Sequence, residues 1–90
     1  MIKIHTVEVQ VKSVKGECAA GYKAGDTFTV ADPVVTPQNN CPLCIYALSA
    51  LFPYLTAAYR QTAADDWINQ VVELQCPDNV NEVIFTLTRR

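Results

Sequence analysis

Hydrophobic and polar residues alternate near the start of the chain, as they do in a β-strand that buries one face. Val7, Val9 and Val11 alternate with polar or charged residues, and this period of two predicts a first strand over residues 2–14. The alternation changes phase near His5 and Thr6, which predicts either a β-bulge at that point or a strand that contacts two surfaces.

The same alternation predicts three further strands, at residues 27–30, 72–76 and 83–87. The last two are separated by the turn-forming sequence of residues 77–79, so we expect them to form a hairpin. The loop at residues 15–26 contains all three glycines of the chain, which suits tight turns.

Apolar residues recur at steps of three and four in the middle of the chain, which predicts one face of an amphipathic helix. The helix is expected to begin near Cys41, after a loop at residues 32–40, and to end near Arg60. Pro53 interrupts the pattern, so we expect either a kinked helix or two short helices. The predicted buried positions are Ile45, Leu48, Phe52, Leu55 and Tyr59.

The predicted order of elements is therefore strand, strand, helix, strand, strand. This order predicts an α+β fold: a two-layer ββαββ domain with a largely antiparallel four-stranded sheet covered by the helix. The 90 residues fit a single domain, 1–90.

Composition excludes several classes of function. A net charge of −2 does not favour nucleic-acid binding, which requires a basic surface. No apolar stretch approaches the ~20 residues that span a bilayer, and no secretory signal is visible at residues 1–4. We therefore expect a cytoplasmic protein without a membrane or nucleic-acid partner, in a compartment that keeps most thiols reduced.

The sharpest motif is Cys41-Pro42-Leu43-Cys44, a C-x-x-C at the expected helix start. The amides and dipole of a helix start favour a thiolate over a thiol. Locally the segment resembles the active site of a glutaredoxin, but the ββαββ order does not match the βαβ context that a thioredoxin fold would give this motif.

The chain contains four cysteines, and their residue type allows metal binding. Four thiolates can bind zinc or an iron–sulfur cluster, although a zinc ribbon normally has two C-x-x-C pairs and this chain has one. The alternative is plain burial, because cysteine packs well as a small hydrophobic residue. The candidate metal ligands are Cys18, Cys41, Cys44 and Cys76.

The sequence does not decide whether the protein is an enzyme. The only histidine, His5, lies in the first predicted strand, where surface or satisfied histidines are more common than ligands. A nucleophilic role for Cys44 lacks a recognisable general base.

The order of motifs resembles a small, uncharacterised prokaryotic family of about this length that is frequent in anaerobes. The resemblance rests on a G-x-C-x-x-G-Y-K-x-G-D-x-F loop at residues 16–28, a cysteine at the helix start, and C-P-D followed by V-I-F-x-L-x-R at residues 76–89. It implies a shared thiol site at Cys18, Cys44 and Cys76, with Cys41 as an addition; the family usually has histidine where this chain has Tyr22.

Two functions are therefore expected. The first is a thiol-centred metal-binding, cluster-binding or redox module built on Cys18, Cys44 and Cys76, with or without Cys41. The alternative is a non-enzymatic protein-interaction domain or accessory subunit, for example a homodimer, in which the cysteines are merely buried.

Overall fold

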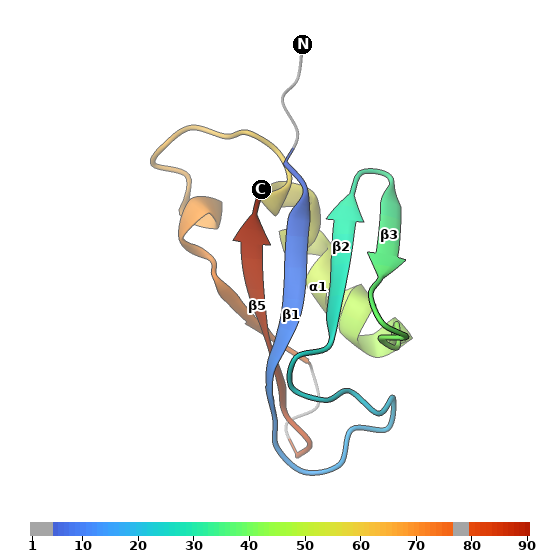
Figure 1. Cartoon of the computed structure of the whole chain (residues 1–90). Coiled ribbons are helices and arrows are strands. Elements are labelled where there is room, and N and C mark those ends of the chain that lie inside the picture. The colour runs from blue at the N-terminus through green and yellow to red at the C-terminus, as the bar shows by residue number, and fades with distance from the viewer. Residues whose placement is uncertain (1–4, 77–79) are drawn as a thin grey trace.

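The computed structural model describes residues 5–76 and 80–90, which form a β-sheet with one α-helix packed on one face (Figure 1). The helical elements are α1 (Ile45–Ala58) and a short 3-10 helix, η1 (Trp67–Gln70). The strands are β1 (Val7–Val14), β2 (Thr27–Ala31), β3 (Val34–Pro37), β4 (Glu73–Gln75) and β5 (Val83–Arg89).

The strands of the described residues lie in the order β3-β2-β1-β5-β4, and every neighbouring pair is antiparallel. β1 is the central strand: Val9 pairs with Phe28 of β2 on one side and with Leu87 of β5 on the other. The expected hairpin of the last two strands is present, with Leu74 opposite Phe85.

The prediction of a four-stranded ββαββ sheet was wrong, because the described residues form five strands. The additional strand, β3, lies within residues 32–40, which were expected to be a loop because of their prolines. The chain reverses at Asp32-Pro33, and the β-branched residues that follow pair with β2. Pro37 ends this edge strand, a place where a residue without an amide proton is tolerated.

The helix also differs from its prediction. It begins only at Ile45, with Cys44 as its N-cap, and it continues through Pro53 to Ala58 as one helix rather than two. The residues that it buries are Ala47, Leu51, Leu55 and Ala58.

The expected apolar stripe was only partly correct. Leu55 and Tyr59 are buried as expected and Leu48 is half-buried against the core. Ile45 is 70% exposed and Phe52 is 41% exposed, so these two positions were wrong. Two of the four buried helix residues are alanines, whose small side chains let a helix lie close to a sheet. A periodicity counted over large apolar residues alone could not identify Ala47 and Ala58 as buried positions.

The core lies between α1 and one face of the sheet. Val9 of β1, Phe28 of β2 and Phe85 of β5 are at most 1% exposed, and the rings of Phe28 and Phe85 meet edge to face with their centroids 6.4 Å apart. A side chain of this kind contributes about 1.5–3 kcal/mol when it is fully buried.

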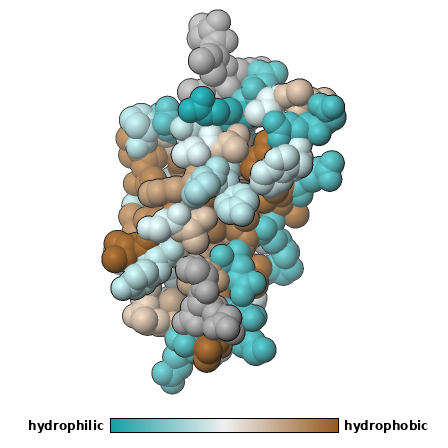
Figure 2. All heavy atoms as spheres, turned by 180° about the vertical axis from the view of Figure 1, so that it is seen from behind, coloured by the Kyte–Doolittle hydropathy of each residue, from teal (hydrophilic) through white to brown (hydrophobic). Residues whose placement is uncertain are grey.

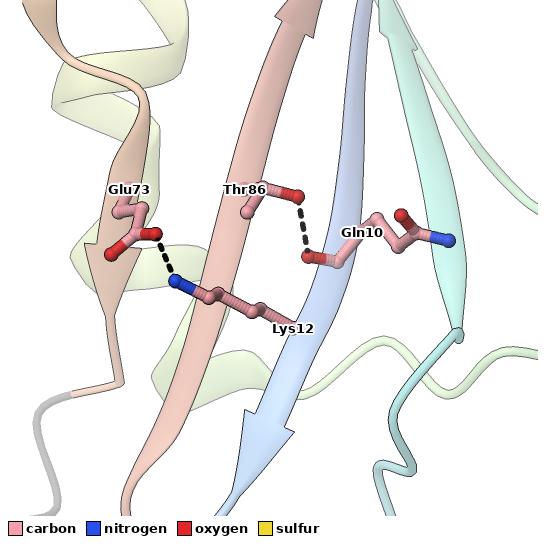
Figure 3. A network of polar contacts seen from close by, with 4 residues as sticks. All are labelled: Gln10, Lys12, Glu73 and Thr86. Carbon is pink, nitrogen blue, oxygen red and sulfur yellow. Dashed lines mark hydrogen bonds and ion pairs between the residues drawn. The ribbon is translucent and has the colours of Figure 1, made fainter.

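The opposite face of the sheet is polar and bears cross-strand contacts (Figure 3). Lys12 of β1 reaches across β5 to the Glu73 carboxylate of β4, with Nζ and Oε2 2.5 Å apart. The Thr86 hydroxyl donates to the Gln10 carbonyl oxygen at 3.3 Å. These contacts join β1, β5 and β4 on the solvent side.

The irregularity of β1 lies elsewhere than predicted. The pairing of β1 with β5 shifts register between Val11 and Ser13, not at His5. His5 precedes the strand, and its amide donates to the Tyr59 carbonyl oxygen at 2.6 Å. Residues 2–4, the first part of the predicted strand, lie outside the described residues.

Candidate functional site: a thiol-lined pocket

Three segments that are far apart in the sequence contribute to one region of the molecule, which lies in the lower half of Figure 1. They are the loop of residues 15–26 between β1 and β2, the start of α1, and the end of the β4–β5 hairpin. Each segment carries one cysteine: Cys18, Cys44 and Cys76, respectively.

The loop is fastened to the β4–β5 hairpin by hydrogen bonds that two of its main-chain amides donate. The Lys15 amide donates to the Glu82 carbonyl oxygen at 2.7 Å, and the Glu17 amide donates to Asn81 Oδ1 at 3.0 Å. Gly16, between them, has a φ of +84°, and a Cβ atom there would lie 2.4 Å from Asn81 Oδ1. Only glycine fits this close approach in a left-handed conformation.

Tyr22 fastens the same loop to the helix. Its hydroxyl oxygen accepts the Cys44 amide at 3.1 Å, which satisfies a main-chain donor at the start of α1. The side chain is only 4% exposed, and its ring meets Phe85 edge to face with centroids 5.5 Å apart. Packing in the core thus fixes the Tyr22 ring, and its hydroxyl oxygen in turn fixes the position of the Cys44 amide.

The third segment is fixed by the hairpin itself. Cys76 follows the last residue of β4, and its amide donates to the Val83 carbonyl oxygen at 3.0 Å. The cysteine is therefore held against the first residue of β5. A further main-chain bond within the loop, from the Gly21 amide to the Cys18 carbonyl oxygen at 2.9 Å, shapes the turn that presents Cys18.

The three cysteines line one open pocket of about 320 Å³. All three side chains are partly buried against the hydrophobic core. Figure 2 shows the molecule from the side of α1, where hydrophobic side chains lie among hydrophilic ones. The described residues that complete the lining are Ala19, Ala20, Tyr46 and Asn81.

Cys41 is not among the residues that line this pocket. It is 4% exposed, and its sulfur lies 3.4 Å from the Pro42 carbonyl oxygen. Burial raises the pKa of the Cys41 thiol, the nearby Asp26 carboxylate raises it further, and a hydrogen bond from the Thr27 amide lowers it in part. Cys41 is therefore a buried neutral thiol that belongs to the core.

The Tyr22 hydroxyl is also kept neutral. Burial raises its pKa from 10.0 to about 12, against the opposing effect of the Cys44 amide, and negative charge on Cys41, Cys44 or Cys18 would raise it as well. Tyr22 therefore lies close enough to these three cysteines for their charge to affect its pKa. At neutral pH its hydroxyl stays protonated.

The described residues of the pocket do not by themselves form a site for a single metal ion. Within residues 5–76 and 80–90, no group of three or more histidine, cysteine, aspartate or glutamate side chains is placed to hold a metal ion. Thiolate ligands of zinc lie about 2.3 Å from the metal, so they must converge on one point. The cysteines here surround a space instead.

Of the four predicted ligands, the structure thus brings together Cys18, Cys44 and Cys76 and places Cys41 in the core. All four are free thiols. Sequence reasoning did not find Tyr22 as the partner of the Cys44 amide, nor Tyr46 and Asn81 as walls of the pocket. Tyr46 follows Cys44 by two residues, but Asn81 has no sequence signal that connects it to Gly16.

No family model, no curated protein and no solved structure matches the chain. The resemblance to a small prokaryotic family therefore stays a prediction. Among the residues that the structure describes, no helix combines the length and the apolar character that crossing a membrane requires.

Proposed function

We propose that the protein is a thiol-centred redox module that exchanges with disulfides at the pocket of Cys18, Cys44 and Cys76. The observation that carries the proposal is that three cysteines from three separate segments line one pocket that is open to solvent. Burial alone would not require the cysteines to share a cavity, as Cys41 illustrates.

The reaction is thiol–disulfide exchange, which begins when a thiolate attacks a disulfide sulfur. A pocket thiolate forms a mixed disulfide with the substrate and releases the first substrate thiolate. A second pocket thiolate then attacks the protein sulfur and releases the other. The protein dithiol is oxidised to a disulfide, the substrate disulfide is reduced to two thiols, and two protons pass from protein to substrate.

Redox chemistry fits the pocket better than metal binding does. A metal ion or an iron–sulfur cluster needs several thiolates at once, and the described residues offer no such group. Exchange needs only two thiols at any moment, and the pocket supplies three. Ala19 and Ala20 give the pocket apolar walls beside the sulfurs.

The test is to oxidise the reduced protein with a small disulfide and to map the product by mass spectrometry. We expect one intramolecular disulfide between two of Cys18, Cys44 and Cys76. Replacing a member of that pair with alanine should stop the reaction at the mixed disulfide or abolish it. The matched control is Cys41→Ala, which should leave the product unchanged.

Two outcomes would overturn the proposal. One is that the pocket thiols do not react with any disulfide while the protein is folded. The other is that the disulfide joins Cys41 to a partner, because Cys41 lies outside the pocket lining. A stoichiometric metal ion in protein purified without oxygen, lost in the pocket variants, would favour the metal reading instead.

A second candidate is an interaction domain that forms a homodimer through α1. It is favoured by the large apolar side chains that the helix exposes: Ile45 and Tyr46 are each 70% exposed, and Phe52 is 41% exposed. Exposed apolar groups of this size often mark interfaces. A mass measurement in solution tests it: a dimer that Ile45→Glu converts to a monomer supports this candidate, and a wild-type monomer excludes it.

A further inference from the structure

The lining of the thiol pocket contains no charged side chain among the described residues. Apart from the sulfurs, its polar groups are the Tyr46 hydroxyl and the Asn81 side chain, and the remaining walls are alanine. Common cellular disulfides differ mainly in the charge next to the sulfurs, so this composition bears directly on which disulfide enters.

We infer that the pocket selects a small uncharged organic disulfide, or the uncharged disulfide end of a longer apolar chain, over ionic disulfides such as glutathione disulfide. This inference rests on the proposed redox function and adds the class of substrate. The selecting feature is the space around Cys18, Cys44 and Cys76, which the described residues line with alanine and uncharged polar groups.

The size of the pocket supports a small substrate. Ligand pockets range from about 300 to 1,000 Å³, and this one, at about 320 Å³, lies near the lower end. A five-membered cyclic disulfide with a short alkyl chain is of this order, whereas a folded peptide disulfide is far larger. The openness of the pocket leaves a path for a longer chain to extend into solvent.

Charge supports the same selection. A carboxylate or ammonium group that enters the pocket loses part of its hydration, which is unfavourable without a partner of opposite charge. The described lining offers no opposite charge to compensate. The chain also has a net charge of −2, which opposes the approach of glutathione disulfide, an anion at neutral pH.

The exchange step with such a substrate is balanced without a further reactant. One pocket thiolate attacks the cyclic disulfide and opens it to a mixed disulfide. The second pocket thiolate then attacks the protein sulfur of the mixed disulfide and releases the substrate thiolate. The products are the protein disulfide and the ring-opened dithiol, which carries the two protons that the protein thiols lose.

The experiment compares three probes on the reduced wild-type protein: lipoamide, glutathione disulfide and cystamine. The rate at which each disulfide oxidises the protein is divided by the rate at which the same disulfide reacts with a small reference thiol. This correction removes differences in the intrinsic reactivity of the three disulfides. We expect the corrected rate for lipoamide to exceed that for glutathione disulfide by tenfold or more, where tenfold corresponds to about 1.4 kcal/mol. Cystamine should also react slowly.

A charge placed on the rim should change this preference. Tyr46 lines the pocket and is 70% exposed, so Tyr46→Lys adds a cation there with little effect on folding. We expect the ratio of lipoamide to glutathione rates to fall by about fivefold, from an attraction of about 1 kcal/mol across a few ångströms in water.

The control is Thr56→Lys, which adds the same charge at an exposed position of the same helix. Ten residues along a helix span about 15 Å, beyond the Debye length of about 8 Å at physiological salt, so the ratio should stay at the wild-type value. Equal corrected rates for lipoamide and glutathione disulfide would overturn the inference and leave the redox function standing. If no probe oxidises the pocket cysteines, the redox function itself fails.

Discussion

The two ends of α1 are held in opposite ways. At the end of the helix, the Arg89 guanidinium donates to the Ala58 carbonyl oxygen at 2.9 Å and to the Ile68 carbonyl oxygen at 2.5 Å. At its start, Cys44 makes no side-chain capping bond, no acidic residue lies in the first turn, and the Cys44 amide is held by the neutral Tyr22 hydroxyl.

The difference suggests separate roles for the two ends: the end of the helix contributes to stability, and the start positions the cysteines of the proposed redox function. A charged side chain makes strong hydrogen bonds, and the molecule uses one where no reactive group is present. Under the proposed redox function, a cation at the start of the helix would pair with a thiolate formed during exchange, and a carboxylate would repel it. A phenol that stays neutral avoids both effects and still positions the main chain. The comparison implies that the two ends respond differently to substitution.

The largest effect on stability is expected at the end of the helix. Arg89→Met removes both hydrogen bonds to carbonyl oxygens of buried residues, and hydrogen bonds to charged groups contribute about 1.5–3 kcal/mol each. Because both bonds come from one side chain, their contributions are not additive, and the free energy of unfolding should fall by about 2–4 kcal/mol, as measured by urea unfolding. In the remaining folded protein, oxidation of the pocket cysteines should keep its wild-type rate; a large change in that rate would mean that the two ends are not independent.

Next in size is a substitution in the loop that carries Cys18. Gly16→Ala forces a side chain into a left-handed conformation and against Asn81 Oδ1, and we expect a loss of about 1–3 kcal/mol. The matched control is Gly21→Ala, because Gly21 has a similar φ of +81° but no atom within 4 Å of the added Cβ.

The difference between these two glycine variants isolates the contact with Asn81 from the cost of the backbone conformation. Thermal unfolding measures the stability, and the rate of alkylation of Cys18 measures whether the loop has moved. Equal losses in the two variants would show that the loop is not fastened to the hairpin through this contact.

A smaller effect is expected at the Tyr22 hydroxyl. Tyr22→Phe leaves the Cys44 amide without its acceptor, which should cost about 1 kcal/mol at neutral pH. It should also change the rate of exchange at the pocket, because Cys44 is then less well positioned. Tyr54→Phe, at an exposed tyrosine of the same helix that is not in the described pocket lining, is the control.

The same variant has a pH signature. The folded-state pKa of Tyr22 is raised from 10.0 to about 12, so the unfolded chain loses this proton first. The contribution of Tyr22 to stability is therefore complete below pH 10 and is lost as the pH rises toward 12. Urea unfolding across this window should show a shallower decline for Tyr22→Phe than for the wild type; parallel curves would contradict the burial of the phenol.

The smallest effect is expected on the solvent face of the sheet. The Lys12 and Glu73 side chains are 55% and 46% exposed, and exposed ion pairs contribute about 0–1 kcal/mol. Lys12→Met should therefore lower the free energy of unfolding by less than about 1 kcal/mol, and the difference should vanish at high salt. A loss as large as that of Arg89→Met would contradict the ranking.

The sequence predicted well those parts of the fold where local pattern and burial agree. In β1, β2 and β5, the apolar positions of the alternating pattern are the buried ones. Val7, Val9 and Phe85, for example, are fully buried. Residues 34–37 form a strand only because β2 offers them a free edge, and this tertiary effect overrides the local signal of two prolines.

The candidate site was predictable by residue type but not in its geometry. The family-like motif pointed to Cys18, Cys44 and Cys76, and the structure places these three around one pocket. Nothing in the spacing of Cys41 and Cys44 shows that one faces the pocket and the other the core. That division depends on where the helix begins, which is at Ile45 rather than near Cys41.

The central position of β1 constrains when the pocket can assemble. β1 pairs with β5, so that Val7 lies opposite Arg89, and this long-range pairing closes the sheet only after residues 83–89 have left the ribosome. Until then Cys18 and Cys44 are part of a chain whose hairpin wall is missing. Nascent chains therefore carry these two thiols without the wall of the pocket that the β4–β5 hairpin supplies.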